Sequence, residues 1–581
     1  MATDASPPAP AHDARDLLPG LRTLRSYQRR WLRADLVAGL VLAAILVPQG
    51  MAYAELAGLP AVTGLYTTIA CLVGYAVFGP SRVLVLGPDS SVSPLIFAAI
   101  VPLVVTDDPA SAIALAGMLA LLVGALEIAL GLGHLGFVAD LLSKEIQVGY
   151  MNGLAVTIVV GQLPKLFGFS TDADGFVDEV RAFFTHLDET HAATLAVGVA
   201  VLVVLLVLPR FLPRVPAVLV AVVGATVVSA ALALADHGVA TVGVLPRGVP
   251  TPKVPWTSWS DVGPLVLAAF GIVLVSLTDT IATSASFAAR RGEAVDPDQE
   301  MIGIGAANIA AGLFQGFAVS TSGSRTAVAE QSGAKTQLTG VVGAALVAVL
   351  LLFLNGLLAD LPQTTLAAVV IVAALGLADV AAVRRFWTVR RSAGILSLVT
   401  TLGVMLFGVL TGIGIALALA VIMFFRRNWW PHGAVLGTAD GVEGWHDVTT
   451  IPGATEPPGV VVFRWEAPLF FANANAFRNE VRRLVHERHP YWVVLQCEAV
   501  TDIDVTAGAV LTELDEELNA YGVHLAFVEM RSRIQELALR YGLFETLDRT
   551  HFYPTIETAL AAIDAGDDDP GPTGPGADDQ S

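Results

Sequence analysis

Two short segments rich in hydroxyl side chains interrupt an otherwise apolar sequence in the same way. Residues 82–93 read RVLVLGPDSSVS and residues 314–326 read FQGFAVSTSGSRT; each has an extended stretch, then Gly or Ser, then a short helical segment. The first turn of a helix has unpaired N–H groups and roughly half a positive charge. Two such helix starts in one cavity could bind a carboxylate or an oxyanion. The side chains that could add hydrogen bonds or charge are Ser90, Ser91, Ser320, Thr321, Ser322, Ser324 and Arg325.

A purely structural explanation exists for either segment taken alone. The serines could cap helices, and Arg325 could pair with Glu330 or with a lipid phosphate. The repetition of the pattern in both halves of the chain favours anion binding over this explanation.

Asp279 is the most informative single residue. It lies within LVLAAFGIVLVSLTDTIATSASFAA, more than two helical turns from the Arg290-Arg291 pair. A carboxylate at that depth in a membrane costs about 2.5–3.5 kcal/mol on insertion scales, so it normally faces a cavity or a partner. Thr283 is four residues later and therefore on the same helix face, and the two oxygens could frame a cation. The alternative is a carboxylate that only serves packing. Glu127 and Glu55 are weaker candidates of the same kind.

A further polar pair lies in the first apolar run. Pro48-Gln49-Gly50 interrupts the helix there, and Gln49 and Tyr53 share one face at a spacing of four residues. The pair either lines the cavity, with Gln49 donating hydrogen bonds to the anion, or marks a kink with an interfacial tyrosine.

The composition places these residues in a membrane. Of the 581 residues, 54% are hydrophobic and only 15% are charged, whereas a soluble chain carries about a quarter charged residues. Two cysteines exclude a disulfide framework or a Cys-rich zinc module. The net charge of −19 leaves no basic face to neutralise phosphate, so nucleic-acid binding is disfavoured. The acidic N-terminus has no apolar core and does not read as a signal peptide.

The apolar runs between Ala34 and Phe425 predict about fourteen membrane spans, some shorter than the usual ~20 residues. The clearest are 34–54, 111–131, 192–208, 215–235, 263–289, 338–358, 366–382 and two helices within 394–425. The two interrupted segments then open the third and tenth spans, which correspond in two seven-span halves. Such a pair indicates an inverted-repeat transporter with a site at the membrane midplane.

Lys and Arg placement predicts the orientation. With the N-terminus inside, most basic residues fall in inner segments and only Lys165, Arg181, Arg247 and Lys253 fall in outer ones. Both termini are therefore expected in the cytoplasm, and the cytoplasmic membrane is the expected location.

A small soluble α/β domain is expected after the spans. The predicted divisions are a cytoplasmic segment at 1–33, the membrane domain at 34–427, a linker at 428–459, the soluble domain at 460–565 and a disordered acidic tail at 566–581. In the soluble domain Asp504 or Thr506 either caps a helix, which we favour, or forms a regulatory loop that is phosphorylated or receives a partner. No phosphate loop, nucleophile elbow or metal-ligand spacing is present in this domain, so an enzyme is not expected.

Together these segments resemble the sulfate permease (SulP) family of anion transporters. The resemblance is carried by DLVAGLVLAAILVPQGMAYAELAGLPAVTGLY (35–66), DPDQEMIGIGAANIAAGLFQGFAVSTSGSRTAV (296–328) and SGAKTQLTG (332–340). The segment APLFFANA (467–474) resembles the STAS domain that follows the transporter in this family. The resemblance implies fourteen transmembrane helices in two inverted seven-helix repeats, divided into core and gate domains, and usually a homodimer.

The resemblance also implies roles for individual residues. It places the anion at Ser90, Ser91, Val92, Ser322, Gly323, Ser324 and Arg325, faced by Gln49 and Tyr53. In sodium-coupled bicarbonate members, residues matching Asp279 and Thr283 bind Na⁺ with backbone near Thr321, Ser322 and Gly323, whereas many relatives with Glu at the Asp279 position are thought to use protons. The sequence departs from the family pattern at three places. Ala318 replaces a proline that is usual before the tenth span, and the 320–324 segment is rich in serine where bicarbonate carriers have Gly and Ala. Val505 lies at the position where some STAS domains carry a phosphorylated serine.

The expectation is a secondary transporter of a small inorganic anion, with sulfate as the first candidate, coupled to H⁺ or Na⁺ through Asp279. Bicarbonate or dicarboxylate symport, and uncoupled exchange or a channel, are alternatives. A membrane-anchored signalling scaffold that acts through the STAS domain and a cytoplasmic partner is a further one. No cofactor or structural metal is expected apart from Na⁺ as a possible coupling ion.

Overall fold

The computed structural model describes residues 18–104, 109–136, 143–171, 173, 175–212, 215–541 and 551–565. The predicted tail, 566–581, and residues 1–17 of the N-terminal segment lie outside this part. The chain divides into two compact units, Met1–Leu419 and Ala420–Ser581, which we describe separately.

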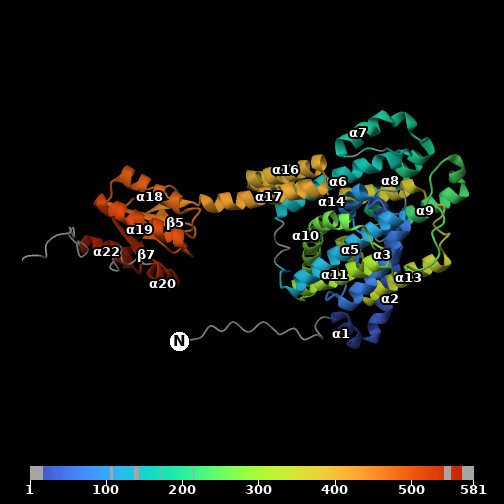
Figure 1. The fold of residues 1–581 in the computed structure, drawn as a ribbon, viewed down its shortest axis with the longest axis horizontal. Helices are drawn as coiled ribbons and strands as arrows, with labels where there is room; N and C mark the ends of the chain where they lie inside the picture. The colour runs from blue at the N-terminus through green and yellow to red at the C-terminus, as the bar shows by residue number, and fades with distance from the viewer. Residues whose placement is uncertain are drawn as a thin grey trace, which may run out of the picture. The chain divides into compact units, whose positions relative to one another are not determined.

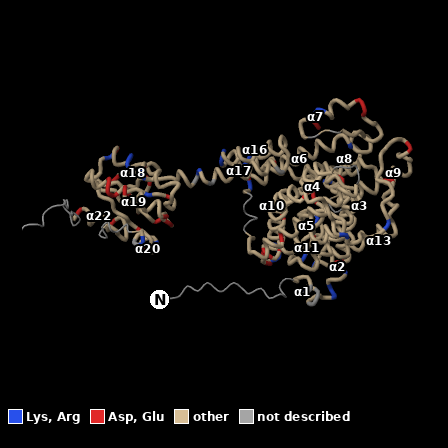
Figure 2. Tube along the Cα trace, viewed as in Figure 1, with Lys and Arg blue, Asp and Glu red and all other residues tan. Residues whose placement is uncertain are grey.

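Fourteen helices among the described residues account for the predicted spans. They are α2 (Leu32–Leu56), α3 (Ala61–Phe78), α4 (Ser93–Ile100), α5 (Pro109–Leu132), α6 (Lys144–Phe167), α8 (Ala192–Phe211), α9 (Ala217–Ala231), α10 (Trp259–Ala289), α11 (Pro297–Leu313), α12 (Gly323–Gln331), α13 (Leu338–Phe353), α14 (Gln363–Leu377), α16 (Arg391–Phe407) and α17 (Val409–Trp429). Three further helices, α1 (Pro19–Arg25), α7 (Phe176–Thr185) and α15 (Val380–Val389), lie between or before them. The expected succession of apolar helices is confirmed (Figure 1), and seven of those described are long and apolar enough to cross a membrane. Charged residues are sparse along most of these helices (Figure 2).

The third and tenth spans are unusually short. Helix α4 has 8 residues and α12 has 9, and at about 1.5 Å per residue neither can cross a hydrocarbon layer about 30 Å thick. Each is preceded by a two-residue strand, β1 (Leu86–Gly87) before α4 and β2 (Ser320–Thr321) before α12. Extended chain therefore completes both spans, as the sequence pattern predicted.

The spans pack in two groups. One contains α2, α3, α4 and α5 with α10, α11, α12 and α13, and the other contains α6 and α8 with α14 and α16. In the first group α5 and α11 are in backbone contact: a Cβ on Gly124 would lie 2.5 Å from the Gly305 oxygen, and one on Gly312 would lie 2.6 Å from the Gly117 oxygen. Each group draws on both halves of the chain, which is the division expected for core and gate domains.

A buried carboxylate fixes the start of α13 within the first group. Asp35 of α2 is fully buried and accepts hydrogen bonds from Lys335 N at 2.7 Å, from Thr336 Oγ1 at 2.8 Å and from Thr339 Oγ1 at 3.2 Å. These bonds satisfy donors at the helix N-terminus that would otherwise lack partners.

The second unit contains a six-stranded sheet in the order β4-β3-β5-β6-β7-β8. Its elements are β3 (Gly433–Ala439), β4 (Val442–Asp447), β5 (Val460–Trp465), α18 (Ala474–Arg488), β6 (Trp492–Gln496), α19 (Val505–Ala520), β7 (His524–Val528), α20 (Ser532–Arg540), β8 (Phe552–Tyr553) and α22 (Ile556–Ala565). Strands β5 to β8 are parallel, whereas β3 pairs antiparallel with both β4 and β5.

The predicted linker at 428–459 is wrong in one respect. It contains β3 and β4, and β3 pairs with β5 from Gly433↔Trp465 to Leu436↔Val462. The sequence of this segment is rich in glycine and alternates only weakly between apolar and polar residues, so it did not predict strands. Ala434 and Leu436 of β3 are buried against the sheet, whereas no residue of β4 is buried.

Candidate functional site

The extended stretches that precede α4 and α12 lie side by side. Strands β1 and β2 are antiparallel neighbours with Leu86 opposite Thr321 and Gly87 opposite Ser320. The pairing continues on both sides: Ser322 N donates to Val85 O at 3.1 Å, and Val85 N donates to Thr326 Oγ1 at 3.0 Å. The two stretches thus form one small sheet that brings both helix starts together.

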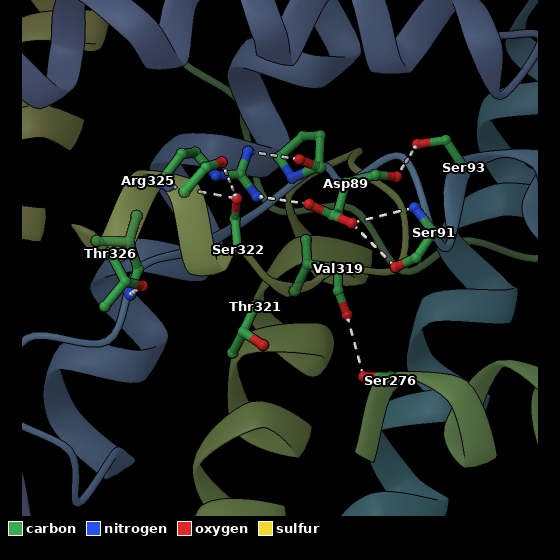
Figure 3. A network of polar contacts seen from close by, with 12 residues as sticks. Asp89, Ser91, Ser93, Ser276, Val319, Thr321, Ser322, Arg325 and Thr326 are labelled. Carbon is green, nitrogen blue, oxygen red and sulfur yellow. Dashed lines mark hydrogen bonds and ion pairs between the residues drawn. The ribbon is translucent and has the colours of Figure 1, made fainter. Parts of the chain in front are cut away.

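Arg325 extends from α12 to the loop before α4 (Figure 3). Its side chain is 1% exposed; Nη1 donates to Pro88 O at 2.6 Å, and Nη2 lies 3.4 Å from Asp89 Oδ1. The alternative partner considered from the sequence, Glu330, instead pairs with Arg290 and Arg291 at 3.6 and 3.3 Å. The arginine is therefore held at the junction of the two segments.

Asp89 is a residue of this candidate site that the sequence did not single out. Its Oδ2 accepts hydrogen bonds from Ser91 N at 3.0 Å and from Ser91 Oγ at 2.9 Å, while Oδ1 faces Arg325. The signal was present, because an acid in a Gly-Pro-Asp-Ser turn at membrane depth requires a partner as much as Asp279 does.

The other predicted anion ligands lie around this ion pair. Ser90, Ser91, Val92 and Ser322 are buried, whereas Gly323 and Ser324 are exposed. Val92 occupies the N-cap of α4 and provides no side-chain cap. Ser322 does cap α12, accepting from Arg325 N at 3.5 Å, so the capping explanation holds for this serine.

Gln49 and Tyr53 are placed differently by α2. Tyr53 is buried, and its hydroxyl contacts the side chain of Ser90. Gln49, one helical turn earlier, is half-buried. Tyr53 therefore lies beside the anion-site segment through a direct contact with Ser90.

Asp279 contacts both the anion-site loop and the second helix group. It is half-buried, its Oδ1 accepts from Gln147 Nε2 of α6 at 3.3 Å, and it contacts the side chain of Ser91. Asp279 is thus linked to Asp89 through Ser91, which contacts both carboxylates. Gln147, like Asp89, was not foreseen, because nothing in the sequence of α6 relates it to α10.

The other predicted coupling residues also lie where α10 meets the β2–α12 segment. Thr321 Oγ1 donates to Thr280 Oγ1 at 3.4 Å. A Cβ placed on Gly323 would lie 4.0 Å from Thr283 Cγ2. The carboxylate, the hydroxyls and the backbone proposed for a coupling cation therefore come from neighbouring elements.

Glu127, a weaker candidate, belongs to a fully buried network behind β2. Its oxygens accept from Ser276 Oγ at 3.0 Å and from Asn308 Nδ2 at 2.7 Å, and Asn308 Oδ1 accepts from Val319 N at 2.7 Å. The network fixes the backbone just before β2, which is a packing role.

Glu55, the other weaker candidate, lies 3.8 Å from Lys165 of α6. Both residues line a cavity of about 270 Å³, together with Glu179 of α7. The ion pair links the C-terminal end of α2 to the C-terminal end of α6, whereas Gln147 lies at the N-terminal end of α6.

In the second unit Asp504 is a helix cap. Its Oδ1 accepts from Ala507 N and its Oδ2 from Phe471 N, both at 2.8 Å. Thr506 is exposed in the first turn of α19. The geometry supports the capping interpretation of Asp504, and Thr506 is left accessible.

Two protein-family models match the chain, one over the membrane helices and one over the C-terminal domain. Residues 32–400 match the model of the sulfate permease family, and residues 452–559 match that of the STAS domain. The chain belongs to the sulfate permease family. This membership makes it a multi-pass membrane anion transporter with a C-terminal STAS domain.

Named relatives of this permease cover almost its whole length. It is 41% identical over 547 residues to a probable sulfate transporter of Mycobacterium tuberculosis, covering 94% of this chain and 98% of the relative. It is 29% identical to probable sulfate transporter 3.3 of Arabidopsis thaliana, covering 95% and 91% of the two chains.

Solved structures share the fold of the permease. Murine solute carrier 26 family member A9, an anion transporter in the inward-facing state, superposes with a TM-score of 0.87 at 24% identity, covering 97% of each chain. The transmembrane domain of the cyanobacterium bicarbonate transporter BicA superposes with a TM-score of 0.60 at 23% identity, covering 68% of this chain and 98% of that domain.

Proposed function

We propose that this permease is a secondary active transporter of a small inorganic anion, with sulfate as the first candidate, in the cytoplasmic membrane. The observation that carries the proposal is the antiparallel pairing of β1 with β2, which joins two helix starts and a buried arginine at one place. Helix N-termini and arginine both favour oxyanions. The names of the relatives support sulfate, because two that cover almost the whole chain are described as sulfate transporters.

Asp279 is the proposed coupling residue. A proton bound to Asp279, or Na⁺ held by Asp279, Thr283 and the backbone at Thr321–Gly323, would remove a negative charge from the neighbourhood of the anion. Since like charges close together are costly away from water, the cation and the anion would bind more tightly together than alone. This difference in affinity is what couples the two movements.

The transport step is proposed to move the first helix group, which holds the anion, past the second. The site is reached from the side of Gly323 and Ser324, which are exposed, while the Glu55–Lys165 pair joins the groups at the other end. With both termini in the cytoplasm, this geometry corresponds to a carrier open toward the cytoplasm. A homodimer and a cytoplasmic partner for the STAS domain belong to the same proposal.

The experiment is a substrate panel in proteoliposomes with Na⁺ and pH gradients imposed independently. We expect labelled sulfate uptake that one of the two gradients accelerates and that excess unlabelled sulfate abolishes. Equal uptake with and without the two gradients would show that transport is not coupled to either ion, as in an uncoupled exchanger or channel. A lack of uptake for sulfate, bicarbonate, dicarboxylate, chloride and nitrate alike would contradict the transport proposal.

A further inference from the structure

The positive charge of Arg325 is already compensated inside the protein. Its two terminal nitrogens face Pro88 O at 2.6 Å and Asp89 Oδ1 at 3.4 Å, and the side chain is 1% exposed. The guanidinium lies against the bare backbone of Gly87, where a Cβ would come within 3.3 Å of Nη1. A free anion that binds Arg325 must therefore share it with Asp89 or displace Asp89 from it.

Asp89 occupies the donors that an incoming oxyanion would use. One carboxylate oxygen faces Arg325, and the other accepts from the backbone N–H and the hydroxyl of Ser91 at 3.0 and 2.9 Å. These are a guanidinium, a backbone N–H before α4 and a serine hydroxyl, the set expected for the substrate. The Asp89 side chain thus mimics a bound anion.

The anion-site segments also have donors left over. Among the described residues, Arg325 Nε and Ser320 Oγ are buried without a hydrogen-bond partner. Buried polar atoms normally find partners, so these two donors on β2 and α12 are available to hydrogen-bond a ligand in addition to the groups that Asp89 occupies.

We propose that Asp89 is a built-in counter-ion that takes the place of the transported anion on Arg325 and allows the empty carrier to return across the membrane. The inference rests on the proposed anion site. An arginine without a partner would be an uncompensated buried charge, which strongly destabilises a protein interior. With Asp89 present, the unloaded site is electrically balanced, and both residues lie in segments of the same helix group, so they move as a pair.

The consequence is net transport. A carrier that can return empty moves its substrate in one net direction, whereas one that can cross only when loaded performs obligatory exchange. Without the carboxylate at position 89, Arg325 would need the anion as its only counter-ion, and the anion would also leave more slowly because affinity differences lie mostly in the dissociation rate.

The test compares two assays of the full-length protein in proteoliposomes with labelled sulfate as the probe. Net uptake is measured into sulfate-free vesicles, and exchange is measured into vesicles preloaded with unlabelled sulfate. For Asp89→Asn and for Asp89→Ser, which both remove the charge and keep a hydrogen-bonding side chain, we expect the ratio of net uptake to exchange to fall about tenfold and sulfate to bind about tenfold more tightly. Two neutral variants are used so that a folding defect in one leaves the other to decide.

The controls separate the counter-ion from a positioning role. Asp89→Glu keeps the charge and should keep the unchanged protein's ratio, and Asp178→Asn removes an exposed carboxylate of α7 and should change neither quantity. If the neutral variants keep the original ratio, or bind sulfate more weakly, Asp89 orients Arg325 instead and the inference is overturned. If Arg325→Gln binds sulfate as tightly as the unchanged protein, the proposed anion site itself is wrong.

Discussion

Tyr150 of α6 donates a hydrogen bond to the backbone oxygen of Ser91 at 2.6 Å, and both residues are buried. Ser91 belongs to the loop that opens α4 in the first helix group, while α6 packs with α14 and α16 in the second. The bond therefore joins the anion-site loop to the group past which it must move. It can persist only in conformations in which these two elements stay in the present register.

We predict that Tyr150→Phe shifts the conformational equilibrium away from this register. A net hydrogen bond is worth about 0.5–1.5 kcal/mol, so the shift should be roughly two- to twelve-fold. A cysteine at the exposed position 324 reports the change, because both native cysteines are buried and give little background. Labelling of Ser324→Cys by a membrane-impermeant maleimide from the cytoplasmic face should slow in the Tyr150→Phe background.

Tyr66→Phe is the matched control, since Tyr66 is half-buried on α3 in the first helix group. Its labelling rate should equal that of the parent. Unchanged or faster labelling in Tyr150→Phe would show that the bond does not hold the protein in the present conformation.

The second prediction concerns coupling. Asp279→Asn should abolish at least about nine-tenths of the stimulation of sulfate uptake by an imposed Na⁺ or pH gradient, because an amide neither binds a proton nor attracts a cation at this depth. Exchange of labelled for unlabelled sulfate should persist, since the amide oxygen introduced at position 279 could still accept from Gln147. Gradient-driven uptake that survives the substitution would move the coupling role to another residue.

The sequence carried enough information for the membrane fold and for the two interrupted helices. Their positions follow from local features that a reader can count: apolar runs, a glycine or serine cluster and a helix start. The strands of the second unit around 460, 492 and 524 were found for the same reason, because each is a short, continuous apolar run.

The contacts that complete the site could not be read in this way. Asp89 and Arg325 are separated by 236 residues, and Gln147 and Asp279 by 132. Their meeting depends on how the two halves of the chain pack, which periodicity does not reveal. The sequence did not single out Asp89, and Glu330, the partner considered for Arg325 within its own segment, pairs with Arg290 and Arg291 instead.

The third prediction tests the carboxylate that fixes the start of α13. Asp35→Ala should lower the unfolding free energy by roughly 3 kcal/mol, because it leaves several buried donors at 335–339 without an acceptor. Asp35→Asn keeps one acceptor oxygen and should cost less. Thermal unfolding of the full-length protein in detergent measures both, and equal stability of Asp35→Ala and the unchanged protein would contradict this role.

The last prediction concerns Asp515 in the STAS domain, a buried carboxylate in α19. Burial, aided by the neighbouring charge of Glu516, raises the pKa of Asp515 from its ordinary value near 3.8 to about 7. Asn519 Nδ2 donates to its Oδ2 at 3.2 Å, which compensates only part of the lost hydration. Because the folded state holds this proton more tightly than the unfolded state, the stability of the domain should fall as pH rises from about 4 to about 7 and stay level above that.

Asp515→Asn should remove this dependence and leave the domain more stable than the unchanged protein at pH 8. Hydrogen exchange of peptides from 505–520 in the full-length protein, corrected for the intrinsic effect of pH, measures the change. Glu536→Gln, which removes an exposed carboxylate of α20, should leave the pH dependence intact. The unchanged protein could show the same protection of α19 against hydrogen exchange at pH 5 and at pH 8. In that case folding does not favour the protonated form of the Asp515 carboxyl group. The raised pKa would then have no part in the stability of the domain.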